Sequence, residues 1–318
     1  MENEVNLSGQ AVPWERATIE KLLFAELRER RAARRWRLLR SLLWMGLLGA
    51  MVSVLASEQL PSATPSSAHT AMVAIKGEIS DAGEGSAEYI LPALRSAMQD
   101  KGAQALVLLI NSPGGSPVQA GLIHDEVRRL RALHDKPVYA VVEESCASAA
   151  YYIAAGADRI YVDKASLVGS IGVLINGFGF TGTLDKLGVE RRLLTAGENK
   201  GFLDPFSPQS DAQRAHAQRM LDQIHQQFIG VVRQGRGERM KETPEMFSGL
   251  FWTGEQAVQL GLADGLGSLD MVAREVVKAE KLVDYTNKEN IAERFAKRLG
   301  ASVGQGAMAA LRGGAGWR

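Results

Sequence analysis

The strongest constraint on the fold is a series of short apolar runs that alternate with helical patterns in the central part of the chain. Residues 71–75, 105–110 and 138–142 are such runs, short enough to be strands that are buried on both faces. The segments between them, 88–98 and 121–133, carry apolar residues at helical spacing. Short buried strands that alternate with helices are typical of a parallel sheet with right-handed crossovers. The sequence therefore predicts an α/β fold.

The remaining elements are predicted from the same patterns. In the helix at 121–133, five residues are expected to face the core: Leu122, Ile123, Val127, Leu130 and Leu133. Further strands are predicted at 159–162, 167–175 and 189–195. Further helices are predicted directly after Ser148, at 208–234, after the capping residue Thr253, at 269–280 and at 290–299. Residues 197–208 have no periodicity and are predicted to form a loop.

Two turns rich in small residues follow neighbouring strands of this predicted sheet. Ser-Pro-Gly-Gly at 112–115 comes after the strand at 105–110, and Cys-Ala-Ser at 146–148 comes after the strand at 138–142. The carboxyl ends of parallel strands meet at one edge of a sheet, and ligands of such folds bind there. We therefore expect both turns at the ligand-binding edge.

Composition and motifs exclude several classes of function. The formal net charge of +1 gives no reason to expect a nucleic-acid partner. Cys146 is the only cysteine, so no intrachain disulfide can form. The chain has neither an H-E-x-x-H motif nor a P-loop pattern. Neither a metal nor a nucleotide cofactor is therefore predicted.

The first part of the chain has the pattern of a membrane anchor. Seven arginines lie between residues 28 and 40, and residues 41–56 carry no charge. With Leu38 and Leu39 included, this predicts a transmembrane helix over 38–56 whose N-terminus is cytoplasmic. The alternatives are a cleaved signal peptide, for which the charged region is too long, and a buried core helix, which needs no flanking arginines.

The chain is thereby divided into five parts. A basic cytoplasmic extension (1–37) precedes the anchor (38–56), and a linker rich in Ser, Ala and Pro follows at 57–70. The α/β domain is expected over 71–284. A basic Gly/Ala-rich tail occupies 285–318.

Ser148 is a candidate nucleophile, because it lies where a strand leads into a helix. A serine hydroxyl needs a base, and none of the five histidines follows a strand. A desolvated lysine can serve instead, and Lys200 lies between polar and glycine residues in the predicted loop. From the residues alone, two alternatives stay open: Ser148 as a helix cap only, and Lys200 as a surface lysine.

Four motifs occur together in an order that resembles a known family. They are Asn-Ser-Pro-Gly-Gly-Ser at 111–116, Ala-Ser-Ala-Ala-Tyr-Tyr-Ile-Ala at 147–154, Val-Gly-Ser-Ile-Gly-Val at 168–173 and Thr-Ala-Gly-Glu-Asn-Lys-Gly at 195–201. Over about residues 71–280 and in its N-terminal anchor, the chain resembles signal peptide peptidase A and its relatives. These are the S49 family of Ser/Lys peptidases, which have a Clp-protease/crotonase-like fold.

This resemblance implies a role for each matching residue. Ser148 matches the nucleophile, Lys200 the general base and Ser170 the serine that hydrogen-bonds the lysine amine. The N–H groups of Gly115 and Ala149 match the oxyanion hole, although relatives usually have glycines where this chain has Ala149 and Ala150. Four apolar residues nearby are candidates for substrate side-chain pockets: Tyr151, Tyr152, Leu167 and Val168.

The expected function is that of a membrane-anchored serine endopeptidase that cleaves apolar peptides such as released signal peptides. The resemblance implies a single-pass protein of the inner (cytoplasmic) membrane with its catalytic domain on the periplasmic or extracytoplasmic side. It also implies a homo-oligomeric ring in which the lysine can reach the serine of a neighbouring subunit. The alternatives are a non-catalytic scaffold for peptides or membrane partners, a peptidase that clips membrane proteins, and a coenzyme A-dependent crotonase-type enzyme.

Overall fold

The computed structural model describes residues 36–47, 49 and 67–286, and the chain divides into two compact units, Met1–Thr64 and Pro65–Arg318. In the first unit, residues 36–47 are helical and exposed. Among the described residues, no helix is both long enough and apolar enough to cross a membrane. Residues 48 and 50–56 of the predicted anchor, the linker up to residue 66, the helix at 290–299 and the tail from residue 287 lie outside the described residues.

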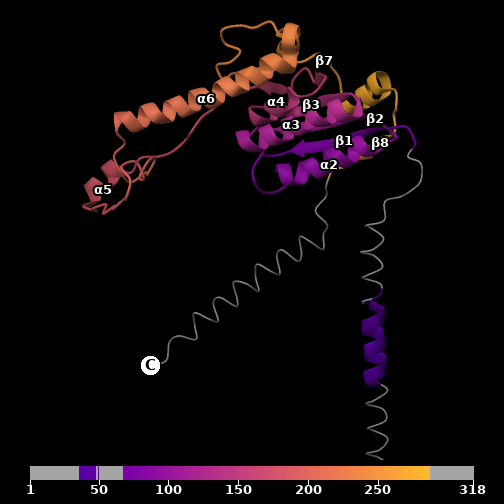
Figure 1. Ribbon diagram of the computed structural model, residues 1–318, viewed down its shortest axis with the longest axis horizontal. Coiled ribbons are helices and arrows are strands. Elements are labelled where there is room, and N and C mark those ends of the chain that lie inside the picture. The colour runs from indigo at the N-terminus through magenta and orange to yellow at the C-terminus, as the bar shows by residue number, and fades with distance from the viewer. Residues whose placement is uncertain (1–35, 48, 50–66, 287–318) are drawn as a thin grey trace, which may run out of the picture. The chain divides into compact units, whose positions relative to one another are not determined.

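The second unit, hereafter the domain, is built on one mainly parallel sheet (Figure 1). The strand order is β6-β5-β3-β2-β1-β8, with β4 paired to β3 and β7. Only the β5–β6 pair is antiparallel within the described sheet. The strands are β1 (His69–Lys76), β2 (Ala103–Ser112), β3 (Val138–Ala147), β4 (Arg159–Val162), β5 (Leu167–Gly169), β6 (Phe251–Thr253), β7 (Gly265–Leu266) and β8 (Leu282–Asp284). The predicted α/β fold with a parallel sheet is confirmed.

Helices cover both faces of the sheet. They are α2 (Ala87–Gln99), α3 (Pro117–His134), α4 (Ala149–Ala154), α5 (Thr181–Leu187), α6 (Asp211–Arg236), α7 (Gly254–Gln259) and α8 (Leu269–Met271), which continues as a π-helical segment, Val272–Val277. The larger core packs α2, α3 and α4 against β1, β2 and β3. On the opposite face Val272 packs with Val107, Leu109 and Val141.

Strand β3 pairs with two different neighbours along its length. Its first half, 139–142, pairs with β4, whereas 145–147 pair with β5. On its other side β3 pairs with β2, with a register shift between Ile110 and Ser112. This change of partner, here called the strand fork, places the end of β5 alongside the end of β3, directly before Ser148.

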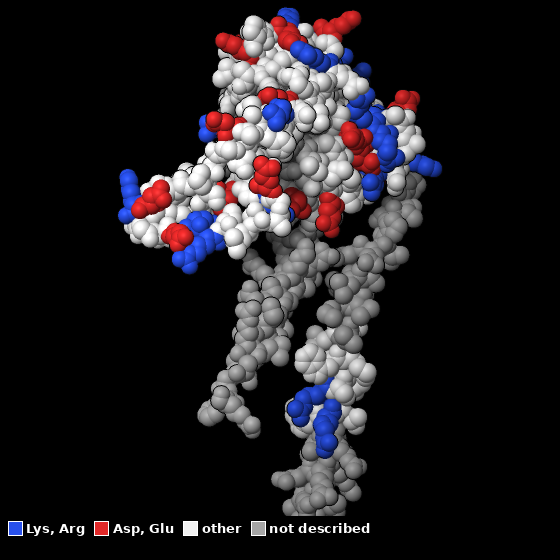
Figure 2. Space-filling view, turned by 60° about the vertical axis from the view of Figure 1, so that its left-hand side comes forward, with Lys and Arg blue, Asp and Glu red and all other residues white. Residues whose placement is uncertain are grey.

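A long segment projects from the sheet and is here called the arm, residues 173–210. It contains α5 and leads into the far end of α6 (Figures 1 and 2), and none of its residues is buried. Locally it is held by the stacked rings of Phe180 and Phe206, 5.5 Å apart, and by the bond from the Phe180 N–H to the Pro205 carbonyl at 2.7 Å. Several large apolar side chains of the arm are exposed: Leu174, Phe178, Leu187, Val189 and Leu194.

Three details of the predicted secondary structure are wrong. Residues 189–195 lie in the arm, where no described strand is available to pair with them, and they form no strand. The strand predicted over 167–175 ends at Gly169, because the chain there turns toward the arm. In α3, Ile123, Val127 and Leu130 are buried as expected, but Leu122 and Leu133 are exposed.

Candidate active site

Ser148 occupies a strained turn between β3 and α4. Its backbone has φ 51° and ψ −123°, a conformation that costs free energy for any residue except glycine. The Ser148 N–H donates to the carbonyl of Gly169 at 2.8 Å, which ties the turn to the end of β5. The strand fork therefore fixes the backbone from which the hydroxyl projects.

The Ser148 hydroxyl is not used to cap the helix that it precedes. Five other helices start after a serine or threonine whose hydroxyl accepts the N–H three residues on: Ser86, Ser116, Ser210, Thr253 and Ser268. Ser148 makes no such bond. The helix-cap alternative is thereby excluded for its side chain, and the hydroxyl is left free for chemistry.

The glycine turn after β2 packs directly against Ser148. Gly114 has φ 106° and Gly115 has φ 142°, values that L side chains rarely adopt. A β-carbon on Gly115 would lie 2.0 Å from the Ile79 carbonyl oxygen, so only glycine fits. The Ile79 N–H bonds the Gly114 carbonyl at 2.8 Å, and the Ser116 N–H bonds the Ile79 carbonyl at 2.7 Å.

This bridge leaves the Gly115 N–H on the side away from Ile79, because the peptide groups of an extended segment alternate in direction. The Ala149 N–H lies at the start of α4, where no intrahelical acceptor exists. Within residues 67–286, neither amide has a backbone acceptor. Two donors are therefore free beside the Ser148 hydroxyl, as an oxyanion hole requires.

Ser148, Gly115, Ala149 and Ser170 line one cavity of about 810 Å³. Ser170 lies just beyond β5 with φ 48°, and its N–H donates to the Leu250 carbonyl at 2.8 Å. The other lining residues are Pro113, Pro117, Tyr152, Gly172, Val173, Leu174, Ile175, Leu221, Ile224, Gln227, Phe228, Ser248 and Gly249. None of them carries a charge, and none is a histidine that could form a triad with Ser148.

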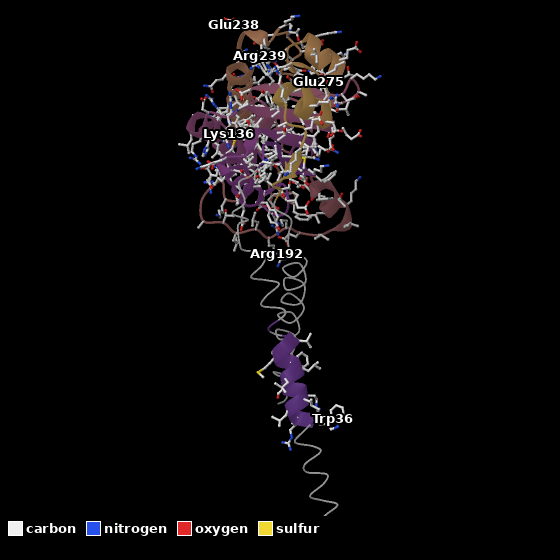
Figure 3. All side chains as sticks on the ribbon, turned by 90° about the vertical axis from the view of Figure 1, so that its right-hand side faces the viewer. Trp36, Lys136, Arg192, Glu238, Arg239 and Glu275 are labelled. Atoms are coloured by element: carbon white, nitrogen blue, oxygen red, sulfur yellow. The ribbon has the colours of Figure 1, made fainter. Side chains whose placement is uncertain are left out.

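The structure does not bring Lys200 to this cavity. Lys200 is exposed in a turn of the arm, where its N–H donates to the Gly197 carbonyl at 3.1 Å. It is not among the lining residues. Figure 3 shows another arm residue, Arg192, at the opposite end of the domain from Arg239. The structure thus joins Ser148, Ser170, Gly115 and Ala149, and leaves the predicted base apart.

Of the four predicted pocket residues, Tyr152 alone lines the cavity. Tyr151 is fully buried and its hydroxyl donates to the Leu262 carbonyl at 2.7 Å, so it is a core residue. Val168 is also fully buried, and Leu167 is exposed away from the cavity. These three expectations are corrected, because adjacent residues of a short helix or strand point to different sides.

Two further points concern the cysteine two residues before Ser148 and residues of α6 that the sequence analysis did not assign to the site. Burial raises the pKa of the Cys146 thiol, which is completely buried and is therefore not a nucleophile. Leu221, Ile224 and Phe228 of α6 form one wall of the cavity. Their helical spacing predicts an apolar stripe, but it contains no information about which surface the stripe faces.

Comparison with known proteins decides the family. The profile of Peptidase family S49 matches residues 131–284. A putative protease of Synechocystis is 30% identical over 209 residues, which cover 65% of this chain and 73% of that protein. The chain belongs to peptidase family S49.

Two further proteins are similar to parts of this chain. Putative signal peptide peptidase SppA of Enterococcus faecium is 31% identical over 222 residues, 67% of this chain and 64% of that protein. A Brucella melitensis protein named Na⁺/H⁺ antiporter NhaA is 48% identical over 178 residues, 55% of this chain. The chain spans about a quarter (24%) of the length of that protein.

Proposed function

We propose that the protein is a serine endopeptidase that works through an acyl-enzyme at Ser148. The observation that carries this proposal is the free Ser148 hydroxyl on a strained turn beside two free amide N–H groups. If Ser148 served only to begin α4, an ordinary N-cap conformation would bond the first N–H groups of the helix without backbone strain. Membership of a peptidase family points to the same chemistry.

The proposed reaction has two steps, formation of an acyl-enzyme and its hydrolysis. Ser148 Oγ attacks the substrate carbonyl carbon while the base takes the hydroxyl proton, and the oxyanion accepts hydrogen bonds from Gly115 and Ala149. The C–N bond then breaks as the amine takes the proton, leaving an ester on Ser148. A water that gives its proton to the base attacks this ester, the C–O bond breaks, and Ser148 regains its proton.

We propose Lys200 as the base, supplied by the arm of a neighbouring copy in a ring of identical subunits. Lys200 does not line the cavity of its own chain, and the arm that carries it exposes Leu187, Val189 and Leu194 to solvent. Exposed apolar surface of this extent favours a protein partner. Inside such an interface the ammonium would be desolvated, which favours the neutral amine that a base needs.

The substrate class follows from the cavity lining. No charged side chain lines it, whereas Tyr152, Ile224 and Phe228 offer apolar surface. An apolar cavity disfavours a charged side chain, which would lose its hydration without gaining a partner. We therefore propose uncharged, mainly apolar peptides, with released signal peptides as the natural example, since one relative is named a putative signal peptide peptidase.

The remaining parts of the proposal rest on the sequence. They are a Clp-protease/crotonase-like fold, an uncleaved N-terminal anchor in the inner membrane and a catalytic domain on the extracytoplasmic side. The uncharged stretch after seven arginines supports the anchor. A scaffold without catalysis and a peptidase that clips membrane proteins are the competing functions.

The proposal is tested by labelling the full-length protein with a serine-reactive fluorophosphonate and locating the adduct by mass spectrometry. We expect a single adduct on Ser148, absent in Ser148→Ala and retained in Ser248→Ala, whose serine lines the same cavity. Mixing Ser148→Ala with Lys200→Ala should restore part of the peptide turnover if the base comes from a neighbour. Absence of any Ser148 adduct would favour the scaffold.

A further inference from the structure

A second cavity, of about 270 Å³, lies at the opposite end of α4 from Ser148 and is here called the polar cavity. One wall is a face of α3, where His124, Arg128 and Arg131 recur at helical spacing. The other walls come from the turn after α4 and from the end of α6. The remaining lining residues are Ala155, Gly156, Ala157, Asp158, Gln234, Gly235 and Arg239.

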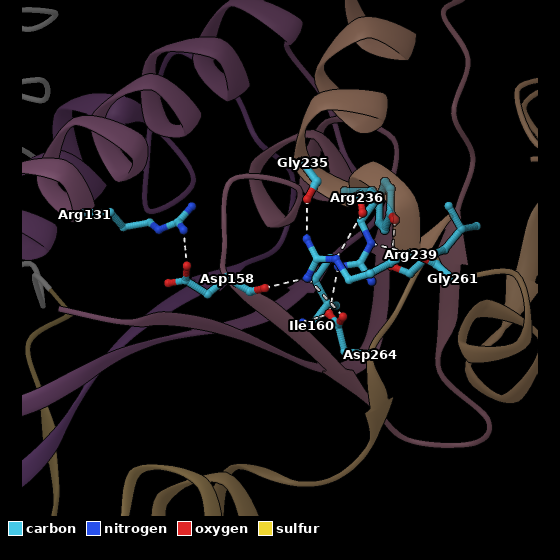
Figure 4. A network of polar contacts seen from close by, with 10 residues as sticks. Arg131, Asp158, Ile160, Gly235, Arg236, Arg239, Gly261 and Asp264 are labelled. Atoms are coloured by element: carbon cyan, nitrogen blue, oxygen red, sulfur yellow. Dashed lines mark hydrogen bonds and ion pairs between the residues drawn. The ribbon is translucent and has the colours of Figure 1, made fainter. Parts of the chain in front are cut away.

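The charges around the polar cavity do not balance. Three arginines line it, against one carboxylate, that of Asp158. Asp158 already accepts from Arg131 and, through its other oxygen, from the Val138 N–H at 2.8 Å. Outside the lining, the Asp264 carboxylate is shared by Arg236 at 2.8 Å and Arg239 at 3.1 Å, so the two carboxylates of Asp158 and Asp264 face four arginines in all (Figure 4). The cavity therefore keeps a net positive charge.

Two of the three arginines are held in place by backbone carbonyls. Arg131 donates to the Gly156 carbonyl at 2.7 Å, and Arg239 donates to the carbonyls of Asp158 and Gly235 (Figure 4). A guanidinium has five N–H donors. Arg239 also donates to the Arg236 carbonyl and to the Asp264 carboxylate, so its four bonds leave one donor, whereas Arg131 makes two bonds and leaves three. These bonds fix the positions of both positive charges, and Arg131 keeps most of its donors for a ligand.

Arg128, the third arginine, differs from Arg131 and Arg239. Among the described residues it has neither an ion pair nor a side-chain hydrogen bond, although it lines the cavity one helical turn after His124. An exposed, unpaired arginine on the rim can move toward a ligand without breaking any internal contact. It is therefore the cation most available to an anion.

His124 supplies a buried polar group of a different kind. It is 3% exposed, and its Nδ1 lies 3.1 Å from the Asp125 carboxylate. A carboxylate only accepts, so Nδ1 carries the proton and Nε2 of the neutral ring is an acceptor. The Nε2–Cδ2 edge faces Gly156 of the cavity wall: a β-carbon there would lie 3.0 Å from Cδ2 and 3.6 Å from Nε2. Within the described chain, Nε2 has no donor.

We infer that the polar cavity binds free inorganic phosphate as the hydrogen phosphate ion. Its charged oxygens accept hydrogen bonds from Arg128 and Arg131, and its P–OH donates to Nε2 of His124. Arginine forks match phosphoryl oxygens well, and such bonds are stronger than neutral ones. An ion that combines acceptors with one donor satisfies both kinds of free group. Sulfate, which has no proton to donate at neutral pH, satisfies only the arginines.

The test is calorimetric titration of the full-length protein with inorganic phosphate at constant ionic strength. We expect one site per chain and an affinity about tenfold lower in Arg128→Gln, which loses a charge-assisted hydrogen bond. Arg219→Gln is the matched control, because Arg219 is exposed on α6, carries the same charge and does not line the cavity. Its affinity should equal that of the wild type.

Sulfate and glycerol 3-phosphate identify the ligand. Sulfate should bind more weakly than phosphate, and His124→Phe, which keeps an aromatic ring beside Tyr152, should remove this preference. Tighter binding of glycerol 3-phosphate than of phosphate would overturn the assignment to the free ion. The proposal is also overturned by absence of phosphate binding, by unchanged affinity in Arg128→Gln, by equal loss in Arg219→Gln, or by equal binding of sulfate.

Discussion

Gly114 lies directly against Ser148. A β-carbon built on Gly114 would be 2.7 Å from the Ser148 Cβ and 2.8 Å from the Ala147 carbonyl oxygen. The glycine turn after β2 and the serine turn after β3 are therefore packed as one unit. Strand register explains why, since Ser112 pairs with Cys146 in neighbouring parallel strands.

A methyl group at Gly114 should therefore displace the proposed nucleophile. We expect Gly114→Ala to lower kcat/KM for an apolar peptide by about a hundredfold or more, because a misplacement of about 1 Å has effects of that size. Gly121→Ala is the control: Gly121 lies in α3 with nothing within 4 Å of the added carbon. That variant should keep full activity and gain about 0.5–1 kcal/mol of stability. Comparable activity in Gly114→Ala and Gly121→Ala would contradict the close packing of Gly114 against Ser148.

Substitutions at the two adjacent tyrosines should change different properties: stability at Tyr151 and peptide preference at Tyr152. Tyr151→Phe removes a buried hydrogen bond to the Leu262 carbonyl, so the free energy of unfolding should fall by about 1–2 kcal/mol without a change in peptide preference. Tyr152→Ala opens the cavity wall and should change KM among peptides with different apolar side chains. Urea unfolding and steady-state kinetics check the pair. A change of preference in Tyr151→Phe would argue against its place in the core.

Glu126 should make stability depend on pH in acid. Its carboxylate accepts from Arg129 at 2.7 Å and from Arg95 at 2.6 Å, and these bonds outweigh the opposing effect of burial and lower its pKa to about 2. In the unfolded chain a Glu pKa is about 4.3, so the stabilisation is complete above that pH and is lost as pH falls toward 2. Glu126→Gln should lower the unfolding free energy by about 2 kcal/mol at neutral pH.

The same comparison should be made over a range of pH. The stability difference between wild type and Glu126→Gln should shrink steadily as pH is lowered below about 4.3. Chemical unfolding at a series of pH values measures it. A difference that stays constant down to pH 3 would show that the ion pairs do not shift the carboxyl titration.

The arm should determine oligomerisation if it packs against a neighbouring copy. Leu194 is 97% exposed in the arm, so Leu194→Asp should lower the assembled mass measured by light scattering. Leu133→Asp places the same charge on an exposed leucine at the end of α3 and should leave the mass unchanged. An effect of Leu133→Asp alone would place the interface elsewhere.

The sheet and the edge that carries the site could be predicted from the sequence, because uniformly apolar strands with intervening helices allow few arrangements of the chain. It could not separate Tyr151 from Tyr152, since both are apolar-bodied residues in a helix of six and the direction of each depends on the packing of α4. The segment 189–195 has strand-like composition, but a strand also needs a neighbour. Nor could it distinguish the free hydroxyl of Ser148 from the capping hydroxyl of Ser210, because both precede a helix.

The most direct test of the proposed function is turnover of a fluorogenic apolar peptide by the full-length protein and matched variants. Ser148→Ala and Lys200→Ala should each lose kcat by roughly 10⁴–10⁶-fold, because nucleophile and base act as a unit. Ser248→Ala in the same cavity and Lys186→Ala in the same arm should stay close to wild type. Equal turnover in Ser148→Ala and wild type would contradict the account, since the catalytic serine would then lie elsewhere.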